Sequence, residues 1–335
     1  MQTTPRDAWD VSEQSFPGTA PVELQLRFLV RYAILAPSVK NSQPWIFEVE
    51  GHTVRLFADP GRGLPVTDPD SRELEISVGC ALENLLVAAE HFGFRHEVTY
   101  FPAGDWATLV ASVLFAPGGT RSPARAGITL DAILHRHNDN GAFRPETVPA
   151  ELRQALQDCR LEPDLQLELV DDGFFRRWLE ELTAEADRRE FADPAFRQEL
   201  GDCIGEGAFG TSRLVSRLAR ALVSRADLGE PAAEQDRRII RSTSLVGVVR
   251  ARNDSRLTHV RTGQLFERLW LAATAMGVNL HPMSQTMRIP ALREAIAGLL
   301  PEDGWIPQHL FRVGYSARET ELRHTPRRAL EEVLR

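Results

Sequence analysis

Two helical segments of this chain repeat each other at a constant spacing, and this repetition constrains the fold more than any other feature of the sequence. Within 79–93 and 263–277, six of fifteen positions are identical at an offset of 184 residues. Strand-like residues follow both segments. We therefore interpret the chain as an internal duplication, with one repeat near 23–117 and the other near 128–335. The repeated residues are Gly79, Glu83, Leu85, Ala88, Ala89 and Gly93, which recur as Gly263, Glu267, Leu269, Ala272, Ala273 and Gly277.

Local patterns divide the chain in keeping with this duplication. Apolar residues at helical spacing run from Glu23 to Ala36 and end at Pro37. Alternating residues on either side of Glu50-Gly51 predict a β-hairpin. We expect an N-terminal extension (1–22), a first half (23–117) and a linker rich in Gly, Ser, Pro and Arg (118–127). The second half (128–335) then contains a helical, charged insertion near 173–241.

The composition is that of an ordinary globular chain. Hydrophobic residues make up 43% and charged residues 26% of its 335 residues, so a sizeable core can be buried. Asp and Glu (47) outnumber Lys and Arg (39), and the net charge of −8 disfavours generic nucleic-acid binding. The N-terminus lacks the apolar core of a signal peptide, and no stretch approaches the ~20 apolar residues of a membrane-spanning helix. We expect a soluble, cytoplasmic protein with no membrane or nucleic-acid partner.

Residue spacing disfavours several kinds of site. Cys80, Cys159 and Cys203 are three distant cysteines without a CxxC pair, which disfavours a disulfide scaffold or a zinc ribbon. His135 and His137 form an HxH pair, but no third ligand stands at a characteristic spacing, so we expect no metal. The segment GRGLPVTDPDSREL is predicted to be a loop without the spacing of a phosphate-binding motif. No nucleophile-elbow motif occurs, so no catalytic side chain is assigned.

The segment APSVKNSQPW, from Ala36 to Trp45, carries the most specific signal. Taken alone, it is a polar turn followed by a core Trp. It resembles the loop of the FMN-dependent nitroreductase family, in which an N-terminal helix ends in a Pro-Ser segment and an Asn-Ser-Gln-Pro-Trp run. The resemblance implies that this loop contacts the flavin, through Pro37, Ser38, Asn41, Ser42 and Gln43.

A second match to the same family opens the second repeat. HRHNDNGAFRPETVPAELRQAL, from His135, resembles the family's Arg-x-Ser-x-x-x-Phe segment before a Val-Pro-x-Glu-Leu helix. The leading Arg of that pattern binds the FMN phosphate, and Arg136 occupies its position. Asn138 replaces the usual Ser, and its amide can still donate to a phosphate oxygen. The resemblance implies that Arg136, His137 and Asn138 bind the cofactor; for Arg136 the alternative is an ordinary surface charge.

The C-terminal segment LFRVGYSARETELRHTPRRALEEVL carries a third match. Taken alone, TPRRALEEVL is a helix with a basic first turn. The segment resembles the closing pattern of the family, a strand ending in Val-Gly-Tyr before a Pro-Arg-Arg run that binds the FMN phosphate. The basic residues correspond to Arg327 and Arg328, with Arg323 and His324 as weaker candidates. A phosphate with nearly two negative charges suits the planar donor fork of an arginine.

A fourth match lies in LHPMSQ, after the repeated helix of the second half. Nitroreductases carry a Pro-x-Glu-Gly turn there, beneath the flavin ring. The resemblance implies that Pro282, Met283, Ser284 and Gln285 bind the cofactor, and that the last two supply donors near its redox-active edge. The usual Glu is absent from this turn. That departure puts ordinary turnover of NAD(P)H in doubt.

The four motifs are divided between the repeats in a complementary way. The first repeat keeps the polar loop but lacks the Arg start, and the second keeps the other three and has RLEPDLQLEL in place of the loop. This resembles the fused, pseudo-dimeric branch of the family, the Acg-type proteins. It implies an α+β, nitroreductase-like fold in which two degenerate repeats form a pseudo-dimer around a mixed antiparallel sheet and central helices. One complete flavin site would then be built within a single chain, without further oligomerisation.

The resemblance implies a flavin-dependent oxidoreductase. Reduced FMN would pass a hydride to an electron-poor small molecule, with NAD(P)H as a candidate donor, and the flavin would carry the chemistry. We expect Lys40, between the polar residues of the loop, to face the small-molecule substrate. The alternative is a protein that sequesters or stores FMN under a lid that blocks nicotinamide, with little reductase activity.

The helical insertion leaves three interpretations open. Four arginines alternate with apolar residues between Ser212 and Arg225, with no acidic residue among them. In the first interpretation this helix binds a membrane or nucleic acid. In the second it is a lid that covers the flavin, and in the third it is a solvated helix with one apolar face toward the core. The Acg-type branch has an inserted lid that closes over FMN, which favours the second interpretation by analogy. In that case the stripe formed by Leu214, Leu218 and Leu222 would cover the flavin cleft.

Overall fold

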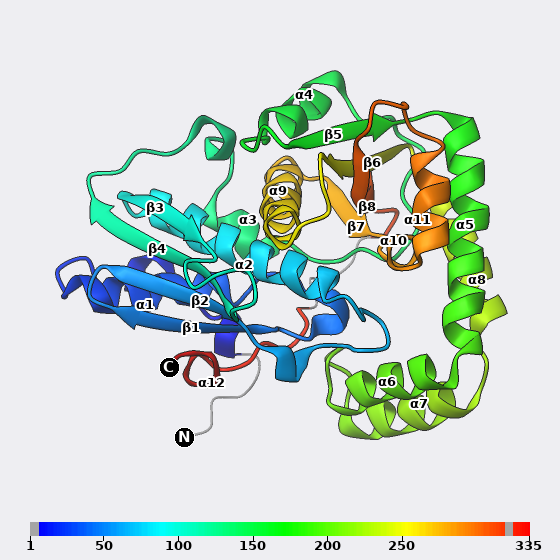
Figure 1. Cartoon of the computed structure of the whole chain (residues 1–335), viewed down its shortest axis with the longest axis horizontal. Helices are drawn as coiled ribbons and strands as arrows, with labels where there is room; N and C mark the ends of the chain where they lie inside the picture. The colour runs from blue at the N-terminus through cyan, green and yellow to red at the C-terminus, as the bar shows by residue number, and fades with distance from the viewer. Residues whose placement is uncertain (1–6, 319–323) are drawn as a thin grey trace.

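The computed structural model describes residues 7–318 and 324–335 and contains two four-stranded antiparallel sheets (Figure 1). The first has the order β1-β2-β4-β3 and the second the order β5-β6-β8-β7, so the two sheets repeat one topology, as an internal duplication predicts. The strands are β1 (Trp45–Glu50), β2 (Thr53–Ala58), β3 (Phe94–Tyr100), β4 (Leu109–Pro117), β5 (Leu165–Val170), β6 (Leu245–Ala251), β7 (Asn279–Pro282) and β8 (Ile306–Gly314).

The pairing of the strands is more regular than the mixed sheet expected from the sequence. All six strand pairings are antiparallel. A register shift interrupts the β2–β4 pair at Leu56/Phe57, and another interrupts the corresponding β6–β8 pair at Val249/Arg250. Among the described residues, parallel pairing is confined to an isolated bridge between Phe47 and Leu334. The fold is therefore α+β with one antiparallel sheet in each half.

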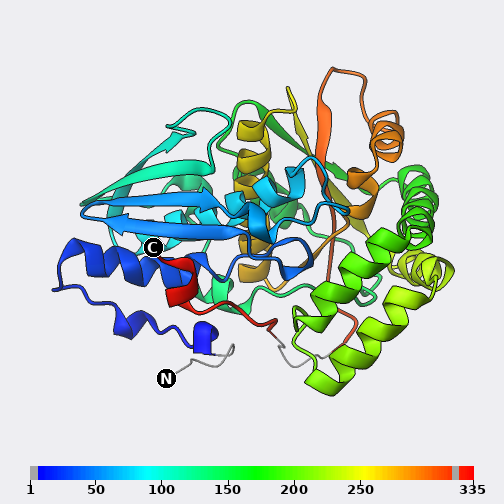
Figure 2. The ribbon, with the colours of Figure 1, turned by 60° about the horizontal axis from the view of Figure 1, so that its bottom comes forward.

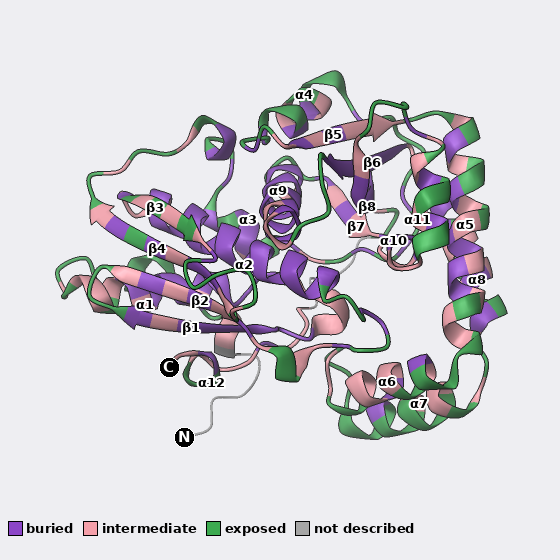
Figure 3. Ribbon diagram, viewed as in Figure 1, coloured by how far each residue is buried: buried purple, intermediate pink, exposed green. Residues whose placement is uncertain are grey.

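Two long helices, α2 (Arg72–His91) and α9 (Arg256–Ala275), pack against each other between the sheets (Figures 1 and 2). Nearly every residue of both is buried, as their purple colour in Figure 3 indicates. A helix that is buried on all sides needs apolar residues all around rather than along one stripe. Residues of both halves contribute to one hydrophobic core around this helix pair.

The C-terminal segment returns to the first half of the molecule. The backbone N–H of Arg335 donates to the carbonyl oxygen of Phe47 on β1 at 2.9 Å. Residues 324–335 therefore run beside the loop that follows the first helix (Figure 1). The helices that complete the two halves are α1 (Val22–Ala33), α3 (Leu130–His135), α4 (Ala150–Asp158), α10 (Gln285–Arg288), α11 (Pro290–Ala297) and α12 (Leu330–Val333).

The insertion consists of four helices that pack in two pairs, α5 (Gly173–Ala192) with α8 (Gly229–Arg241) and α6 (Pro194–Gly205) with α7 (Arg213–Arg225) (Figure 2). The first pair packs along the second half, while α6 and α7 form a separate hairpin. The predicted helical character of this segment is confirmed.

The leucine stripe of α7 does not cover a cleft. Leu214, Leu218 and Leu222 are 69%, 65% and 58% exposed, and α7 appears mostly green in Figure 3. The prediction that this stripe covers the flavin cleft is therefore wrong for this conformation, because α7 packs on α6 through its opposite side. None of the helices in the described ranges has the length and apolar character needed to cross a bilayer.

Candidate functional site

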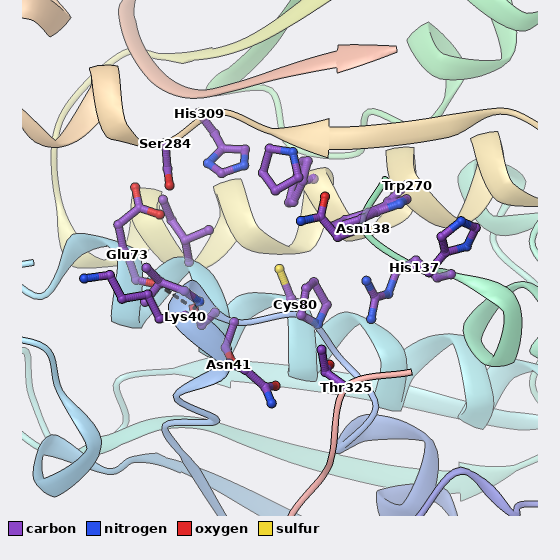
Figure 4. Close-up of a pocket in the computed structure, with 18 of the residues that line it drawn as sticks. Lys40, Asn41, Glu73, Cys80, His137, Asn138, Trp270, Ser284, His309 and Thr325 are labelled. Atoms are coloured by element: carbon purple, nitrogen blue, oxygen red, sulfur yellow. Dashed lines mark hydrogen bonds between the residues drawn. The ribbon is translucent and has the colours of Figure 1, made fainter. Parts of the chain in front are cut away.

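A cavity of about 330 Å³ lies between the two halves, with α2 and α9 on either side (Figure 4). This volume is in the range of small-molecule and cofactor sites. Segments far apart in the sequence contribute its walls, so the tertiary fold rather than any local motif creates it. Ten residues predicted from the sequence line it: Pro37, Ser38, Lys40, Asn41, Arg136, His137, Asn138, Pro282, Ser284 and Arg327.

The loop after α1 is held in a conformation that few residues other than glycine adopt. Lys40, Asn41 and Gln43 have φ angles of 47°, 56° and 51°, in the left-handed region. Such residues are strained and persist where the surroundings fix them. The Ser38 hydroxyl accepts the backbone N–H of Gln43 at 2.9 Å. The Asn41 amide donates to the carbonyl oxygen of Ala208 at 2.8 Å, so the loop is also tied to the insertion.

One end of the cavity, which we call the basic end, contains two buried arginines. Arg136 and Arg327 both donate to the carbonyl oxygen of Leu35 at 3.1 Å. Burial and the adjacent Arg136 lower the pKa of Arg327 to about 9. Burial also lowers the pKa of Arg136. Two guanidinium groups held this close repel each other, so this end of the cavity favours an anion.

Glu267 of α9 is the carboxylate that pairs with Arg136, at 3.4 Å. It is fully buried, and within the described ranges neither of its oxygens accepts a hydrogen bond. Burial raises the pKa of Glu267 to about 7, against the opposing effect of Arg136. A carboxyl group that is only partly ionised at neutral pH leaves the two arginines with a net positive charge.

Further polar groups line the basic end. His137 and Asn138 come from the loop after α3, and His324 and Thr325 come from the C-terminal segment (Figure 4 labels all but His324). Burial and the neighbouring arginines lower the pKa of His324 to about 4, so its ring is neutral at pH 7. That ring stacks on Trp9 at a centroid distance of 3.9 Å. The basic end therefore offers uncharged donors beside its two cations.

The opposite end, which we call the ring end, is lined by aromatic and polar groups. Figure 4 shows Glu73, Ser284 and His309 on this side of the cavity, away from His137. The ring of Phe266 lies 4.1 Å from the ring of His309. The cations at this end are paired, Arg288 with Glu190 and Lys40 with Glu199. This end therefore suits a planar group with polar edges better than it suits an anion.

Lys40 is the only lysine of the chain, and it lies in the cavity wall. Its ammonium group donates to the Thr67 hydroxyl, lies 3.6 Å from Glu199 of α6 and stands over the ring of Phe196 at 4.1 Å. Burial, reinforced by Arg288, lowers the pKa of Lys40 to about 8. Lys40 therefore joins the cavity wall to the insertion and has an appreciable neutral fraction near pH 7.

Three predicted binding residues near the C-terminal segment do not line the cavity. The carbonyl oxygen of Ser42 accepts a hydrogen bond from Arg62 instead. The Oε1 atom of Gln43 accepts the backbone N–H of Arg328 at 2.8 Å, so Gln43 anchors the C-terminal segment. The guanidinium group of Arg328 donates to the carbonyl oxygen of Glu332 at 2.8 Å. Arg327 and Arg328 thus point to different sides of the chain, and only the first reaches the cavity. Arg323 lies outside the described residues.

Met283 and Gln285 also point away from the cavity. Met283 is fully buried in the apolar core of the second sheet. The amide of Gln285 donates to Asp236 of α8 at 2.5 Å. The chain leaves β7 at Pro282 and begins α10 at Gln285. Across this turn, Pro282 and Ser284 line the cavity, whereas Met283 and Gln285 do not.

Sequence reasoning missed the cavity residues of the two central helices and of β8. The repeat already marks α2 and α9 as related helices, and residues three or four apart share a helix face. The cavity residues of α2 are three or four positions apart and so lie on one face of that helix, and the same holds for those of α9. Nothing in the apolar run of β8 singles out its one cavity residue. The missed residues are Glu73, Ile76, Ser77 and Cys80 on α2, Phe266 and Trp270 on α9, and His309 on β8.

The position equivalent to Glu267 in the first repeat, Glu83, has very different surroundings. Its carboxylate accepts hydrogen bonds from Arg125 at 2.6 and 3.0 Å and from Arg268 at 2.9 Å. The amide of Gln264 donates to it at 3.3 Å. Despite burial, the two arginines lower the pKa of Glu83. A closed ion-pair network thus surrounds Glu83, while Glu267 is paired with Arg136, which lines the cavity.

Relatives from Mycobacterium tuberculosis strain H37Rv match the chain along nearly its whole length, although no protein-family model matches it. "Putative NAD(P)H nitroreductase acg" is 28% identical over 332 residues, which cover 95% of this chain and 97% of the relative. "Putative NAD(P)H nitroreductase Rv3131" is 28% identical over 320 residues, covering 92% and 90%. The uncharacterized protein Rv3127 is 29% identical over 329 residues, covering 92% of both chains.

Solved nitroreductase structures show a weaker likeness. A nitroreductase with bound FMN from Desulfitobacterium hafniense has a TM-score of 0.39 and 14% identity, covering 62% of this chain and 95% of that one. The FMN-dependent nitroreductase NfnB of Mycobacterium smegmatis, in complex with NADPH, has a TM-score of 0.39 and 19% identity, covering 60% and 93%. The mycobacterial matches confirm the resemblance inferred from the motifs: over nearly its whole length, this chain is similar to proteins named putative NAD(P)H nitroreductase, Acg among them.

Proposed function

We propose that this protein is an FMN-binding oxidoreductase of nitroreductase type, with its cofactor in the cavity between the halves. The observation that carries the proposal is the convergence of Arg136 and Arg327 at the basic end, where Glu267 is the carboxylate paired with Arg136. A phosphate monoester carries nearly two negative charges at neutral pH and suits a pair of planar donors. The names of two mycobacterial relatives support the same function.

The buried polar atoms of the cavity fit this cofactor. Within 7–318 and 324–335, hydrogen-bond partners are missing for the Nε atom of Arg327, the indole N–H of Trp270 and both ring nitrogens of His309. Buried donors without partners are rare, and each calls for an explanation such as a bound ligand. These atoms lie at both ends of the cavity. A ligand with an anionic end and a polar ring would satisfy them, and FMN has both.

We assign the phosphate to Arg136, Arg327 and Asn138, and the polar edge of the ring to the turn that presents Ser284. The strained loop after α1, which contains Ser38, would line the cofactor between these two ends. FMN, when bound, supplies hydride transfer between NAD(P)H and an electron-poor small molecule. The side chains bind and orient the reactants and exclude water.

Two features bear on turnover. Lys40 would hold a positive charge in the cavity wall near the acceptor, and its pKa of about 8 allows it to donate a proton as well. The turn at Pro282 to Gln285 lacks a Glu, and Gln285 is engaged with Asp236. We therefore expect slow oxidation of NADPH relative to proteins that carry the full turn.

The stoichiometry we propose is one FMN per chain. At the place related to the cavity by the repeat, Arg125 and Arg268 both donate hydrogen bonds to Glu83. These two arginines are thus engaged by a carboxylate and are not free to bind a phosphate. We therefore also propose that binding needs no second copy of the chain.

A second candidate function is the sequestration of FMN with little reductase activity. Phe209, in the connection between α6 and α7, lines the cavity. Glu199 of α6 accepts the backbone N–H groups of Val66 and Thr67 at 2.9 and 3.0 Å. These hydrogen bonds hold the insertion against the first half beside the cavity. In this position the insertion would restrict the entry of nicotinamide.

Three measurements test these proposals. The absorbance spectrum of the purified protein against its mass should give one flavin per chain; no flavin after reconstitution, or two, would contradict the proposal. Anaerobic addition of NADPH should bleach the flavin slowly if the protein is a reductase. Glu199→Ala should speed both this reduction and the loss of FMN if the insertion controls access. Unchanged rates in this variant would argue against the sequestration role.

A further inference from the structure

His309 is a buried histidine for which the protein itself provides no hydrogen bond. It lies on β8, is only 3% exposed and lines the cavity, and Figure 4 shows its ring at the ring end beside Ser284. Among the residues that the structure describes, neither its Nδ1 nor its Nε2 atom has a partner. The ring of Phe266 lies beside it at a centroid distance of 4.1 Å, and the charged side chains of Glu73 and Arg72 oppose each other in their effect on its pKa.

An unpartnered imidazole in this position lowers the stability of the folded protein. A buried polar group that gives up water without gaining a partner is destabilising. Two other histidines do have partners: Nδ1 of His281 accepts a hydrogen bond from Arg312 at 2.9 Å, and Nε2 of His96 lies 3.0 Å from Glu90. The exception at His309 therefore points to a group that is supplied from outside the chain.

The charge of His309 narrows the choice of that group. Burial lowers the pKa of His309 to about 4, so the ring is neutral at pH 7 and carries one N–H donor and one acceptor nitrogen. A neutral ring is a poor counter-ion for phosphate, and the two arginines stand at the other end of the cavity. It matches a neutral heterocycle whose edge alternates carbonyl oxygens with an N–H group.

We propose that His309 is a flavin-binding residue that hydrogen-bonds the pyrimidine edge of the isoalloxazine ring at the ring end of the cavity. This inference rests on the proposed function and deepens it. It assigns to β8 a contribution that the sequence motifs attribute to the turn at Ser284 and Gln285. Because His309 would bind the ring and not the phosphate, it should affect FMN, riboflavin and lumiflavin alike.

The test compares His309→Leu with the wild-type apoprotein in fluorescence titrations with these three flavins. Leu is close to His in volume and removes both nitrogens. We expect the Kd to rise about tenfold for all three flavins, as for one lost buried hydrogen bond. The variant apoprotein should unfold at the same or a higher temperature, because an unsatisfied polar group has been removed. His309→Gln, which keeps a donor and an acceptor, should recover part of the affinity.

His96→Leu is the matched control. It replaces a histidine of the first sheet that is partnered by Glu90 and does not line the cavity. It should lower the unfolding temperature and leave flavin affinity unchanged, which is the opposite pattern.

The outcomes separate the inference from the proposed function. Unchanged Kd values in both His309 variants, or a loss confined to FMN, would overturn the role of His309 while wild-type binding stands. If the wild-type apoprotein binds none of the three flavins, the proposed function fails and the inference fails with it. If His309→Leu does not fold, the decision falls to His309→Gln, for which an unchanged affinity and an unchanged flavin spectrum would contradict the proposal.

Discussion

Gly79 of α2 and Gly263 of α9 meet where the two central helices cross, and their contacts are reciprocal. A Cβ atom on Gly79 would lie 2.0 Å from the carbonyl oxygen of Val260, and one on Gly263 would lie 1.9 Å from that of Ile76. Since 260 − 76 and 263 − 79 are both 184, Val260 is the repeat counterpart of Ile76 and Gly263 is that of Gly79. The contact of Gly79 with Val260 is therefore equivalent to the contact of Gly263 with Ile76. The repeat offset in the sequence is thus a two-fold relation in space.

This crossing should be intolerant of any side chain. Gly79→Ala forces a methyl group into a backbone carbonyl, and we expect a loss of at least 1–3 kcal/mol in unfolding free energy, as for overpacked cores. Urea denaturation of the apoprotein measures it. Gly127→Ala serves as the control, since a Cβ there meets nothing within 4 Å. Similar small effects for both variants would mean that the helices do not cross this closely.

The neighbouring residues Arg327 and Arg328 should differ sharply in their effect on the cofactor. Arg327 lines the basic end, whereas Arg328 does not line the cavity. Arg327→Ala removes a charge-assisted contact worth about 1.5–3 kcal/mol, which is about ten- to a hundredfold in FMN affinity. Titrations should show no such loss for riboflavin, and little loss of either flavin in Arg328→Ala. Equal losses of FMN and riboflavin in Arg327→Ala would indicate that the arginine acts through folding.

The pH dependence of stability should reveal Glu267. Its pKa is raised from 4.5 to about 7 in the folded protein, so between these values the folded chain holds a proton that the unfolded chain has released. This group therefore lowers stability as pH rises from 4.5 to 7, and the penalty is complete above pH 7. Apo Glu267→Gln should be more stable than the wild type at pH 8, by on the order of 2–3 kcal/mol, and should lose this advantage near pH 4.5. Parallel stability curves for the two proteins would refute the raised pKa.

Lys40 offers a site-specific chemical test because the chain has no other lysine. With a pKa lowered to about 8, its amine is deprotonated over a range in which an ordinary lysine is still charged. A small acylating reagent should modify it with a rate that rises to a plateau just above pH 8. Added FMN should slow the reaction by filling the cavity. Peptide mass spectrometry follows the reaction, with the N-terminal amine as the internal reference. A rate that still climbs steeply at pH 10 would contradict the lowered pKa.

The first helix, the β-hairpin around Glu50-Gly51, the two repeated helices and the helical insertion are predicted from the sequence, because helices and alternating strands leave periodic patterns. The start of α2 is not predicted. Residues 61–74 were predicted to be a loop, yet the helix begins at Arg72. The Asp68 carboxylate accepts the backbone N–H groups of Glu73 and Leu74 at 2.9 and 2.8 Å. A cap that reaches in from four residues before the helix has no standard sequence signature.

The candidate site was only partly predictable for a related reason. Motif matching finds the segments that surround a cavity but not the side of each segment that faces it. Arg327 and Arg328, or Ser284 and Gln285, differ only in which side of the chain they occupy, and tertiary packing decides that. His309 was missed because one polar residue in an apolar strand gives no local sign of a cavity beside it.

The divergence of Glu83 and Glu267 has a consequence for how such a chain can change. When two identical subunits share a site, every substitution appears twice, and a residue must suit both copies at once. Covalent union of the halves removes that constraint, since a change at one carboxylate leaves the other as it was. In this chain Arg125 and Arg268 hold one carboxylate in a closed ion-pair network, while the other is paired with Arg136 of the cavity wall. One carboxylate can therefore take a structural role while the surroundings of the other change independently.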